Sequence, residues 1–259
     1  MRYLYVYNPS NMRIGVAQTR PFKGDILRNI EAHLRLIELA GKAQADTIVF
    51  PELSITGYEP ELAAGLATTA DDVRLDIFQT LCERYSMTIG VGIPTTNGDR
   101  VRISEVIFQP GQARQVYSKR YLHSDEEPYF VCGADAGYLD CGRIALAICY
   151  ELSVPAHSEQ AHGNGAEVYL VSVAKTKSGM ERAAETLADI ARRYSMTVLV
   201  SNCVGHCDNF DCGGGSAVWN REGVMLAQLN GVDEGVLVLD TDTGDVVREE
   251  ISTYLHANQ

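Results

Sequence analysis

The sequence predicts an α/β fold, a four-layer α-β-β-α sandwich with two internally similar halves. Short apolar runs alternate with amphipathic segments along the chain, a pattern typical of strands and helices packed in layers. The pentapeptide Arg-Tyr-Ser-Met-Thr occurs at 84–88 and again at 193–197, each time where a predicted helix leads into a predicted strand. Because both copies hold the same structural position, we expect two similarly built halves with the sheets inside and the helices outside.

Length and composition favour a single domain over residues 1–259. A chain of 259 residues with 46% hydrophobic content can bury one large core, and no Pro/Gly/Ser-rich stretch is long enough to be a linker. Residues 1–11 are expected to form an N-terminal extension and residues 243–259 a C-terminal tail. Met12 immediately precedes the first predicted strand, so an upstream extension and a start codon assigned too early both fit residues 1–11.

Charge and cysteine usage limit the possible partners and compartments. The 34 acidic and 22 basic residues give a formal charge of -12, which argues against nucleic acid and anionic lipid surfaces as partners. No window approaches the roughly 20 apolar residues that a membrane span needs. The seven cysteines follow no spacing of a secreted scaffold, so we expect reduced thiols in a cytoplasmic protein.

The first half of the chain is expected to begin with a β-α-β unit. A helix over 26–43 lies between two apolar strands, 13–20 and 46–52. The next helix is expected to bury a face formed by Val73, Ile77, Leu81 and Tyr85. An apolar strand (87–94) and an antiparallel pair (102–109 and 113–119) should follow it.

The second half repeats this alternation after Cys149. Strands are expected at 166–174 and 197–205, and a hairpin over 215–229 that turns at Glu222-Gly223. Ser178 and Glu181 have the spacing of a capping box, which predicts a helix starting there. Its apolar face would consist of Met180, Ala183, Leu187, Ile190 and Tyr194.

Three predicted strands end in a reactive side chain. Glu52 follows the run "TIVFP", Lys119 follows "QVYS" and Cys149 follows "IALAI". In open α/β folds the C-terminal ends of such strands meet where ligands bind. Taken singly, the residues would be read as a loop carboxylate, a surface lysine and a small buried hydrophobe, because the last is the commoner fate of a free cysteine.

Taken together, three segments in this order resemble the signature regions of the carbon-nitrogen hydrolase (nitrilase) superfamily. They are "FPELSITGY" (50–58), "YSKRYLHSDEEPYF" (117–130) and "ICYELSVP" (148–155), and the resemblance extends from about Arg13 to about Asp240. It implies a catalytic set of Glu52, Lys119 and Cys149. It also implies an auxiliary glutamate in the second segment, which we assign to Glu126, with the adjacent Glu127 as a competitor.

The chemistry of these residue types agrees with that implied role. A thiol is only a few per cent ionised at neutral pH, so a nucleophilic cysteine needs a nearby base or cation. Glu52 can take the proton, and Lys119 can stabilise the charge that develops on the substrate. The resemblance adds the backbone N–H of Tyr150 as a second oxyanion donor, and Tyr58 and Glu151 as residues that could line the substrate pocket.

The resemblance also indicates the kind of substrate. Members that hydrolyse nitriles typically carry tryptophan directly after the nucleophile, whereas Tyr150 stands there in this chain. A small amide or carbamoyl compound is therefore favoured, with nitrile hydrolysis as the alternative and no cofactor required. Ser153 and Ala156 replace a basic residue and a carboxylate that many members carry, which leaves the identity of the substrate open.

Several other interpretations compete with this one. Cys203, His206, Cys207 and Cys212 suggest a zinc knuckle, but their spacing fits no usual pair of cysteine ligands, so no metal is expected. A Cys-His hydrolase could use Cys149 with His123 or His157, but it would leave the other two segments unexplained. The glycines in "DCGGGSAVW" (211–219) precede a strand pattern, whereas a phosphate loop would precede a helix.

The chain could also be a non-catalytic binding module that keeps the fold, because fold alone does not establish activity. The intact set Glu52, Lys119 and Cys149 argues against that. Members of the superfamily usually self-associate through the helices that flank the nucleophile, here around 155–163 and 180–194. The resemblance therefore implies a homodimer or a larger homo-oligomer.

Overall fold

The computed structural model describes residues 12–251 and contains two successive α/β halves. The first half consists of β1 (Arg13–Gln18), α1 (Ile26–Lys42), β2 (Thr47–Val49), α2 (Ala63–Leu66), α3 (Asp76–Tyr85), β3 (Thr88–Asn97), β4 (Arg100–Phe108) and β5 (Gln115–Ser118). The second consists of β6 (Tyr138–Leu139), β7 (Ile144–Ile148), α4 (Pro155–Gly163), β8 (Val168–Ser172), α5 (Lys177–Tyr194), β9 (Thr197–Ser201), β10 (Val204–Cys207), β11 (Phe210–Gly213), β12 (Ala217–Trp219) and β13 (Met225–Gln228). The chain then returns to the first half with β14 (Glu234–Asp240) and β15 (Val246–Ile251).

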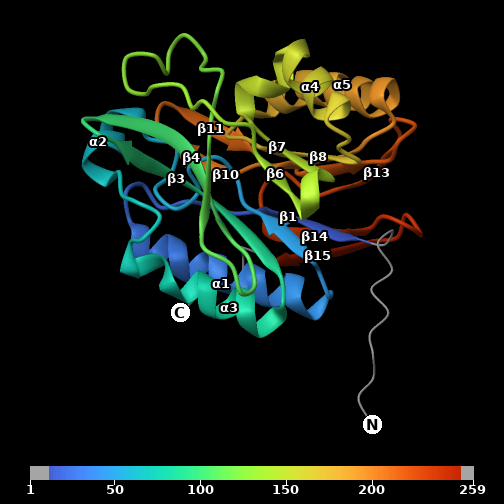
Figure 1. Cartoon of the computed structure of the whole chain (residues 1–259), viewed down its shortest axis with the longest axis horizontal. Helices are drawn as coiled ribbons and strands as arrows, with labels where there is room; N and C mark the ends of the chain where they lie inside the picture. Colours follow the sequence, from blue (N-terminus) through green and yellow to red (C-terminus); the bar gives the residue numbers. More distant parts are fainter. Residues whose placement is uncertain (1–11, 252–259) are drawn as a thin grey trace.

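These elements form the predicted four layers (Figure 1). The seven-stranded sheet has the order β15-β14-β1-β2-β3-β4-β5, and the six-stranded sheet has the order β13-β12-β9-β8-β7-β6. Figure 1 shows α1 and α3 on the outer side of the first sheet and α4 and α5 on the outer side of the second. A separate two-stranded hairpin, β10-β11, completes the set of sheets in the described part of the chain.

The two halves share their strand order and their helix ends. The strands β1-β2-β3 are parallel neighbours in one sheet, and β7-β8-β9 are parallel neighbours in the other. Both copies of the repeated pentapeptide end a helix in the same way, because Ser86 and Ser195 adopt left-handed φ values of 52° and 51°. The methionine that follows is buried in both copies. The internal repeat predicted from the sequence is therefore confirmed.

The core consists of three apolar groups that the layers generate. The central group joins the two sheets and includes Val16, Leu146 and Leu170. One outer group lies between the first sheet and α1 and α3, and the other lies between the second sheet and α4 and α5. Each fully buried aliphatic side chain contributes roughly 1.5–3 kcal/mol, so the sheets that carry the strand ends are held firmly.

Three sequence predictions need correction. The buried face of α3 is formed by Phe78, Leu81 and Cys82, whereas Val73 is 77% exposed because it lies in a separate 3-10 turn before the helix. Ile77 is also exposed, since the large Phe78 ring turns toward the sheet in its place.

The N-cap of α5 is Thr176, because its side chain accepts a hydrogen bond from the Gly179 N–H, and the helix starts at Lys177. The expected capping role of Ser178 is therefore replaced by Thr176. The region 243–259, expected to be a tail, forms strand β15 over Val246–Ile251, where it pairs with β14. The expected extension 1–11 and residues 252–259 lie outside the described residues.

A buried carboxyl group, Glu105, lies between the two sheets. It projects from β4, is 1% exposed, and accepts a 3.4 Å hydrogen bond from Ser172 at the end of β8. Its Oε1 atom has no hydrogen-bond partner in the described part of the chain. Gly90 makes the space for it, since a Cβ there would lie 2.6 Å from Oε1. Burial raises the pKa of Glu105 to about 8.

We expect Glu105→Gln to stabilise the protein in a pH-dependent way. Between roughly pH 4.5 and pH 8 the folded state keeps the Glu105 proton and the unfolded state releases it, so wild-type stability falls as pH rises through this window. Glutamine stays neutral, and its advantage should grow by about 3 kcal/mol between about pH 5.5 and pH 8.5. Urea unfolding at both pH values measures this, with the exposed Glu222→Gln as control. A pH-independent difference would contradict the assigned titration.

Candidate active site

The ends of β2, β5 and β7 bring the three predicted reactive residues to one place. Lys119 directly follows β5 and Cys149 directly follows β7, whereas Glu52 lies in the turn after β2. That turn packs closely on β3, because a Cβ on Gly92 would lie 2.3 Å from the carbonyl oxygen of Pro51. Glycine at position 92 therefore allows the Glu52 backbone to approach the neighbouring strand.

Glu52, Lys119 and Glu126 form a buried ion cluster, here called the acid–lysine cluster. The Lys119 Nζ donates to Glu52 Oε1 at 2.7 Å and to Glu126 Oε1 at 2.6 Å. The three residues are 0–2% exposed. Glu126 is held further by the His123 N–H at 2.8 Å and by the Tyr58 hydroxyl at 3.1 Å. The single lysine charge therefore compensates two carboxylates that are almost fully buried.

Electrostatics within this cluster favour a charged lysine beside a basic carboxylate. Burial disfavours the charge on Lys119, but the negative charges of Glu52 and Glu126 outweigh it and hold the pKa of Lys119 above its usual value. Burial raises the pKa of Glu52, and the charge of Glu126 adds to the effect while Lys119 opposes it. A raised pKa makes Glu52 a stronger base than an exposed glutamate.

Cys149, next to the acid–lysine cluster, has a strained backbone conformation. It opens a short 3-10 helix, Cys149–Ser153, with a φ of 46°, in the left-handed region that favours glycine. Burial raises the pKa of the Cys149 thiol to about 11, with the charge of Glu52 adding to the effect, whereas Lys175 and Lys119 lower it. The thiol is therefore protonated at neutral pH and needs a base to become a nucleophile.

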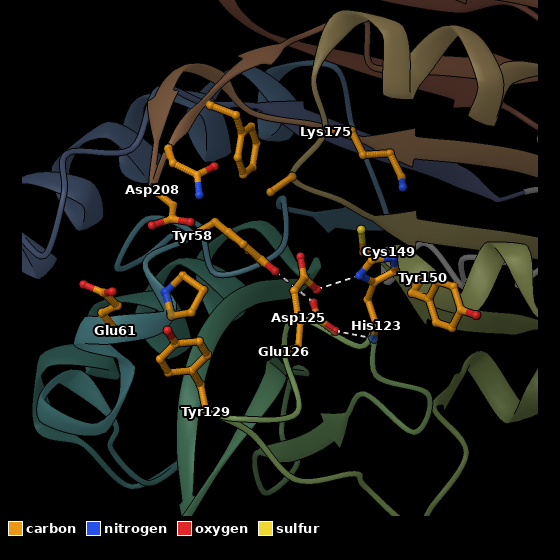
Figure 2. A pocket seen from close by; sticks show the side chains of 14 residues that line it. Tyr58, Glu61, His123, Asp125, Glu126, Tyr129, Cys149, Tyr150, Lys175 and Asp208 are labelled. Atoms are coloured by element: carbon orange, nitrogen blue, oxygen red, sulfur yellow. Dashed lines mark hydrogen bonds and ion pairs between the residues drawn. The ribbon is translucent and has the colours of Figure 1, made fainter.

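Cys149 opens into a cavity of about 400 Å³ (Figure 2). The lining residues come from three loop regions and two strand ends: Tyr58, Pro60, Glu61, His123, Asp125, Glu126, Tyr129, Cys149, Tyr150, Ala174, Lys175, Asp208, Asn209 and Phe210. Figure 2 shows Cys149 and Tyr150 on one side of the cavity and Glu61 and Asp208 on the other. The cavity has room for a small molecule beside the thiol.

Of the remaining predicted site residues, some line the cavity and others do not. Tyr58 and Tyr150 line the cavity. Glu126 accepts a hydrogen bond from Lys119, whereas Glu127, the other candidate for the auxiliary glutamate, is exposed. Glu151 differs from the expectation, because it is fully buried and is not among the residues that line the cavity.

Several cavity residues were not singled out from the sequence. Asp208 and Asn209 form the turn of the β10-β11 hairpin and Phe210 is the first residue of β11; the Phe210 ring lies 5.9 Å from that of Tyr58. The predicted elements, a strand over 197–205 and a hairpin over 215–229, leave this hairpin out, and no local pattern tells which of its side chains face a distant loop. Lys175, shortly after the end of β8, also lines the cavity, and its charge lowers the pKa of Cys149.

The competing interpretations can be compared with this geometry. His157 uses both ring nitrogens for tyrosine hydroxyls, so it is not free to serve Cys149. The Nδ1 atom of His123 bonds to Asp125 at 2.6 Å. Within residues 12–251 no group of three or more His, Cys, Asp or Glu side chains is placed to hold a metal ion, and His206 is exposed and paired with Asp211. None of the described helices has the length and apolar character to cross a bilayer.

Comparisons with known proteins agree with this architecture. The family model described as carbon-nitrogen hydrolase matches residues 13–248. A mutant of the amidase from Nesterenkonia sp. AN1, with the acetamide moiety of fluoroacetamide covalently added at its active-site cysteine, superposes with a TM-score of 0.81 at 22% identity, covering 90% of this chain and 91% of that one.

Two curated proteins are similar in sequence. The glutamine-dependent NAD(+) synthetase of Thermotoga maritima is 24% identical over 251 residues, which cover 92% of this chain and 43% of that protein. A bifunctional nitrilase/nitrile hydratase of Lupinus angustifolius is 22% identical over 289 residues, covering 93% and 81% of the two chains. The chain thus spans less than half the length of the synthetase it matches.

Proposed function

The chain belongs to the carbon-nitrogen hydrolase family of the nitrilase superfamily, and from that premise we propose that it hydrolyses a small amide or carbamoyl compound through a thioester on Cys149. As a member of that family it is a hydrolase of non-peptide carbon–nitrogen bonds. The observation that carries the proposal is the buried acid–lysine cluster directly beside a cysteine that opens into a cavity.

The first half of the reaction forms the acyl-enzyme. Glu52 takes the thiol proton, and the Cys149 sulfur attacks the carbonyl carbon of the substrate. Lys119 and the Tyr150 N–H stabilise the oxyanion that results. Glu52 then returns the proton to the nitrogen, the C–N bond breaks, and ammonia or an amine leaves while a thioester remains on Cys149.

The second half regenerates the enzyme. Glu52 removes a proton from water, which attacks the thioester carbon, and the carboxylic acid leaves as the sulfur recovers its proton. The geometry supports this use of one carboxylate twice. Glu52 Oε1 bonds to Lys119, whereas Oε2 is buried and has no hydrogen-bond partner in the described residues, so it is available to accept a proton. The Cys149 thiol lies near enough for the charge of Glu52 to raise its pKa. Glu126 holds Lys119 in place.

Within this class, L-glutamine is the first amide to test. The carboxamide is the donor group that the name of the synthetase relatives indicates, and their matched segment covers nearly the whole of this chain. Nitrile hydrolysis by the same residues is the second candidate, because the lupin relative bears that name.

A cytoplasmic location remains a prediction. So does self-association through α4 and α5, which a strictly monomeric sedimentation mass would refute.

The test is ammonia release from L-glutamine, butyramide, a carbamoyl compound and a short nitrile, with Cys149→Ala as control. We expect release from at least one amide or carbamoyl compound, lost in the variant. Release only from the nitrile would favour the second candidate. No release from any compound by folded protein, together with ligand binding, would favour a binding module.

A further inference from the structure

Glu151 lies two residues after Cys149 and makes contacts of an unusual kind. It is 0% exposed, and both of its carboxylate oxygens are used within the protein. Oε2 accepts from the Ile148 N–H at 2.7 Å, and Oε1 accepts from the Arg120 N–H at 2.7 Å. Ile148 directly precedes the nucleophile and Arg120 directly follows the lysine of the acid–lysine cluster. One carboxylate therefore binds the backbone beside each of these two residues.

The two backbone segments belong to different sheets. Arg120 follows Lys119 at the end of β5, an edge strand of the seven-stranded sheet, whereas Ile148 ends β7 in the six-stranded sheet. Packing of apolar side chains between sheets is not directional, so it does not set the distance between two strand ends by itself. Two charge-assisted hydrogen bonds to one rigid group do set it.

A chain of buried hydrogen bonds through Tyr117, His157 and Tyr169 also holds the Glu151 carboxylate. The Tyr117 hydroxyl donates to Glu151 Oε2 at 2.6 Å and lies 3.1 Å from His157 Nε2, and His157 Nδ1 lies 2.8 Å from the Tyr169 hydroxyl. Because Tyr117 gives its only proton to Glu151, His157 must donate from Nε2 and accept the Tyr169 proton at Nδ1. Burial lowers the pKa of His157 to about 4, which agrees with this neutral ring.

We propose that Glu151 is a positioning residue that holds Cys149 against Glu52 and Lys119 by tying the end of β5 to the end of β7. This inference rests on the proposed function, since it assumes that the contact between the two sheets matters for the thiol. It replaces the expectation that Glu151 touches the substrate. The strained φ of Cys149 explains the need for such a tie, because the turn after Ile148 must be held from outside.

Glutamine cannot replace Glu151 in this arrangement. Every neighbour is a donor, so the amide NH₂ would face either the Arg120 N–H or the pair formed by Ile148 N–H and Tyr117 hydroxyl. One strand end therefore loses its acceptor in Glu151→Gln although the side chain keeps its size. Tyr117→Phe is the matched control, since it removes one hydrogen bond and leaves both backbone bonds in place.

The experiment measures the coupling between Glu52 and Cys149. Iodoacetamide alkylates the thiolate with loss of iodide, so the pH dependence of its rate at Cys149 reports the apparent pKa of that thiol without any substrate. The charge of Glu52 raises this pKa, so Glu52→Gln should lower it in the parent enzyme. In the Glu151→Gln background we expect the same substitution to shift the pKa by less than half as much, because the two groups are no longer held together. Tyr117→Phe should retain more than half of the coupling.

The outcomes separate the inference from the proposed function. Equal shifts in the two backgrounds would overturn the positioning role and leave the proposed function intact, since a purely structural role changes stability and not this coupling. No shift in the parent enzyme would overturn both. If Glu151→Gln does not fold, Glu151→Asp is measured instead, because aspartate keeps the charge but is one methylene too short to reach both strand ends. In the Glu151→Asp background, Glu52→Gln should likewise shift the pKa of Cys149 by less than half as much as in the parent enzyme.

Discussion

Lys119→Met should lower kcat/KM for amide hydrolysis by about a thousandfold or more. Loss of one oxyanion donor alone costs on the order of 10²–10³ in rate. Lys119 is also the cation that lies 2.6–2.7 Å from both Glu52 and Glu126, and all three side chains are almost fully buried. Without it, at least one carboxyl group must take up a proton, and a protonated Glu52 cannot accept the proton of the Cys149 thiol.

The same substitution should destabilise the fold. Removing one partner of a buried ion pair costs about 3–5 kcal/mol, because the remaining charge stays buried. The measurement is kcat/KM for the amide identified by ammonia release, together with urea unfolding. Lys42→Met, on the exposed end of α1, is the matched control. A folded Lys119→Met enzyme with activity within tenfold of wild type would contradict the role assigned to the lysine.

Glu52→Gln should lower kcat by about 10²–10⁴ with little loss of stability. Glutamine has the same shape, and Lys119 keeps its ion pair with Glu126, so no uncompensated charge is created. What is lost is the group that moves the proton in both halves of the reaction. The Cys149 thiol itself should remain reactive, and alkylation should occur at lower pH than in wild type because the charge of Glu52 no longer raises its pKa.

The lower kcat and the retained thiol reactivity of Glu52→Gln are informative only when both are measured. Slow turnover with a reactive thiol identifies a missing base, whereas slow turnover with an unreactive thiol would indicate a distorted site. Glu127→Gln is the control, since Glu127 is an exposed carboxylate next to Glu126. Glu52→Gln at the wild-type rate would contradict the base assignment.

The sequence was most informative where side-chain identity and strand ends coincide. Glu52, Lys119 and Cys149 could be placed together because each follows an apolar or half-apolar strand and because their three segments resemble the signature regions of one family. The structure brings the ends of β2 and β5 in one sheet and of β7 in the other to the same place. Glu126 accepts a hydrogen bond from Lys119, and its role as the auxiliary glutamate stays a prediction. The repeated pentapeptide located two equivalent helix ends for a local reason, the left-handed serine.

The errors arise where tertiary packing decides between local alternatives. Val73 and Ile77 fit a helical stripe, but the larger Phe78 ring fills the space against the sheet. Ser178 fits a capping box, yet Thr176 two residues earlier reaches the same backbone. The buried orientation of Glu151 depends on the backbone of Arg120, which lies 31 residues away just after β5, and no local pattern contains that information.

The most direct test of the thioester mechanism is peptide mass spectrometry of enzyme quenched in acid during turnover of butyramide or L-glutamine, whichever releases ammonia, in wild type and in Glu52→Gln. The proposed mechanism predicts the acyl group of the substrate on the peptide that contains Cys149, and its release as a hydroxamic acid when neutral hydroxylamine is added. Consumption of the amide with the acyl group on another residue, or at an undiminished rate in Cys149→Ala, would contradict it.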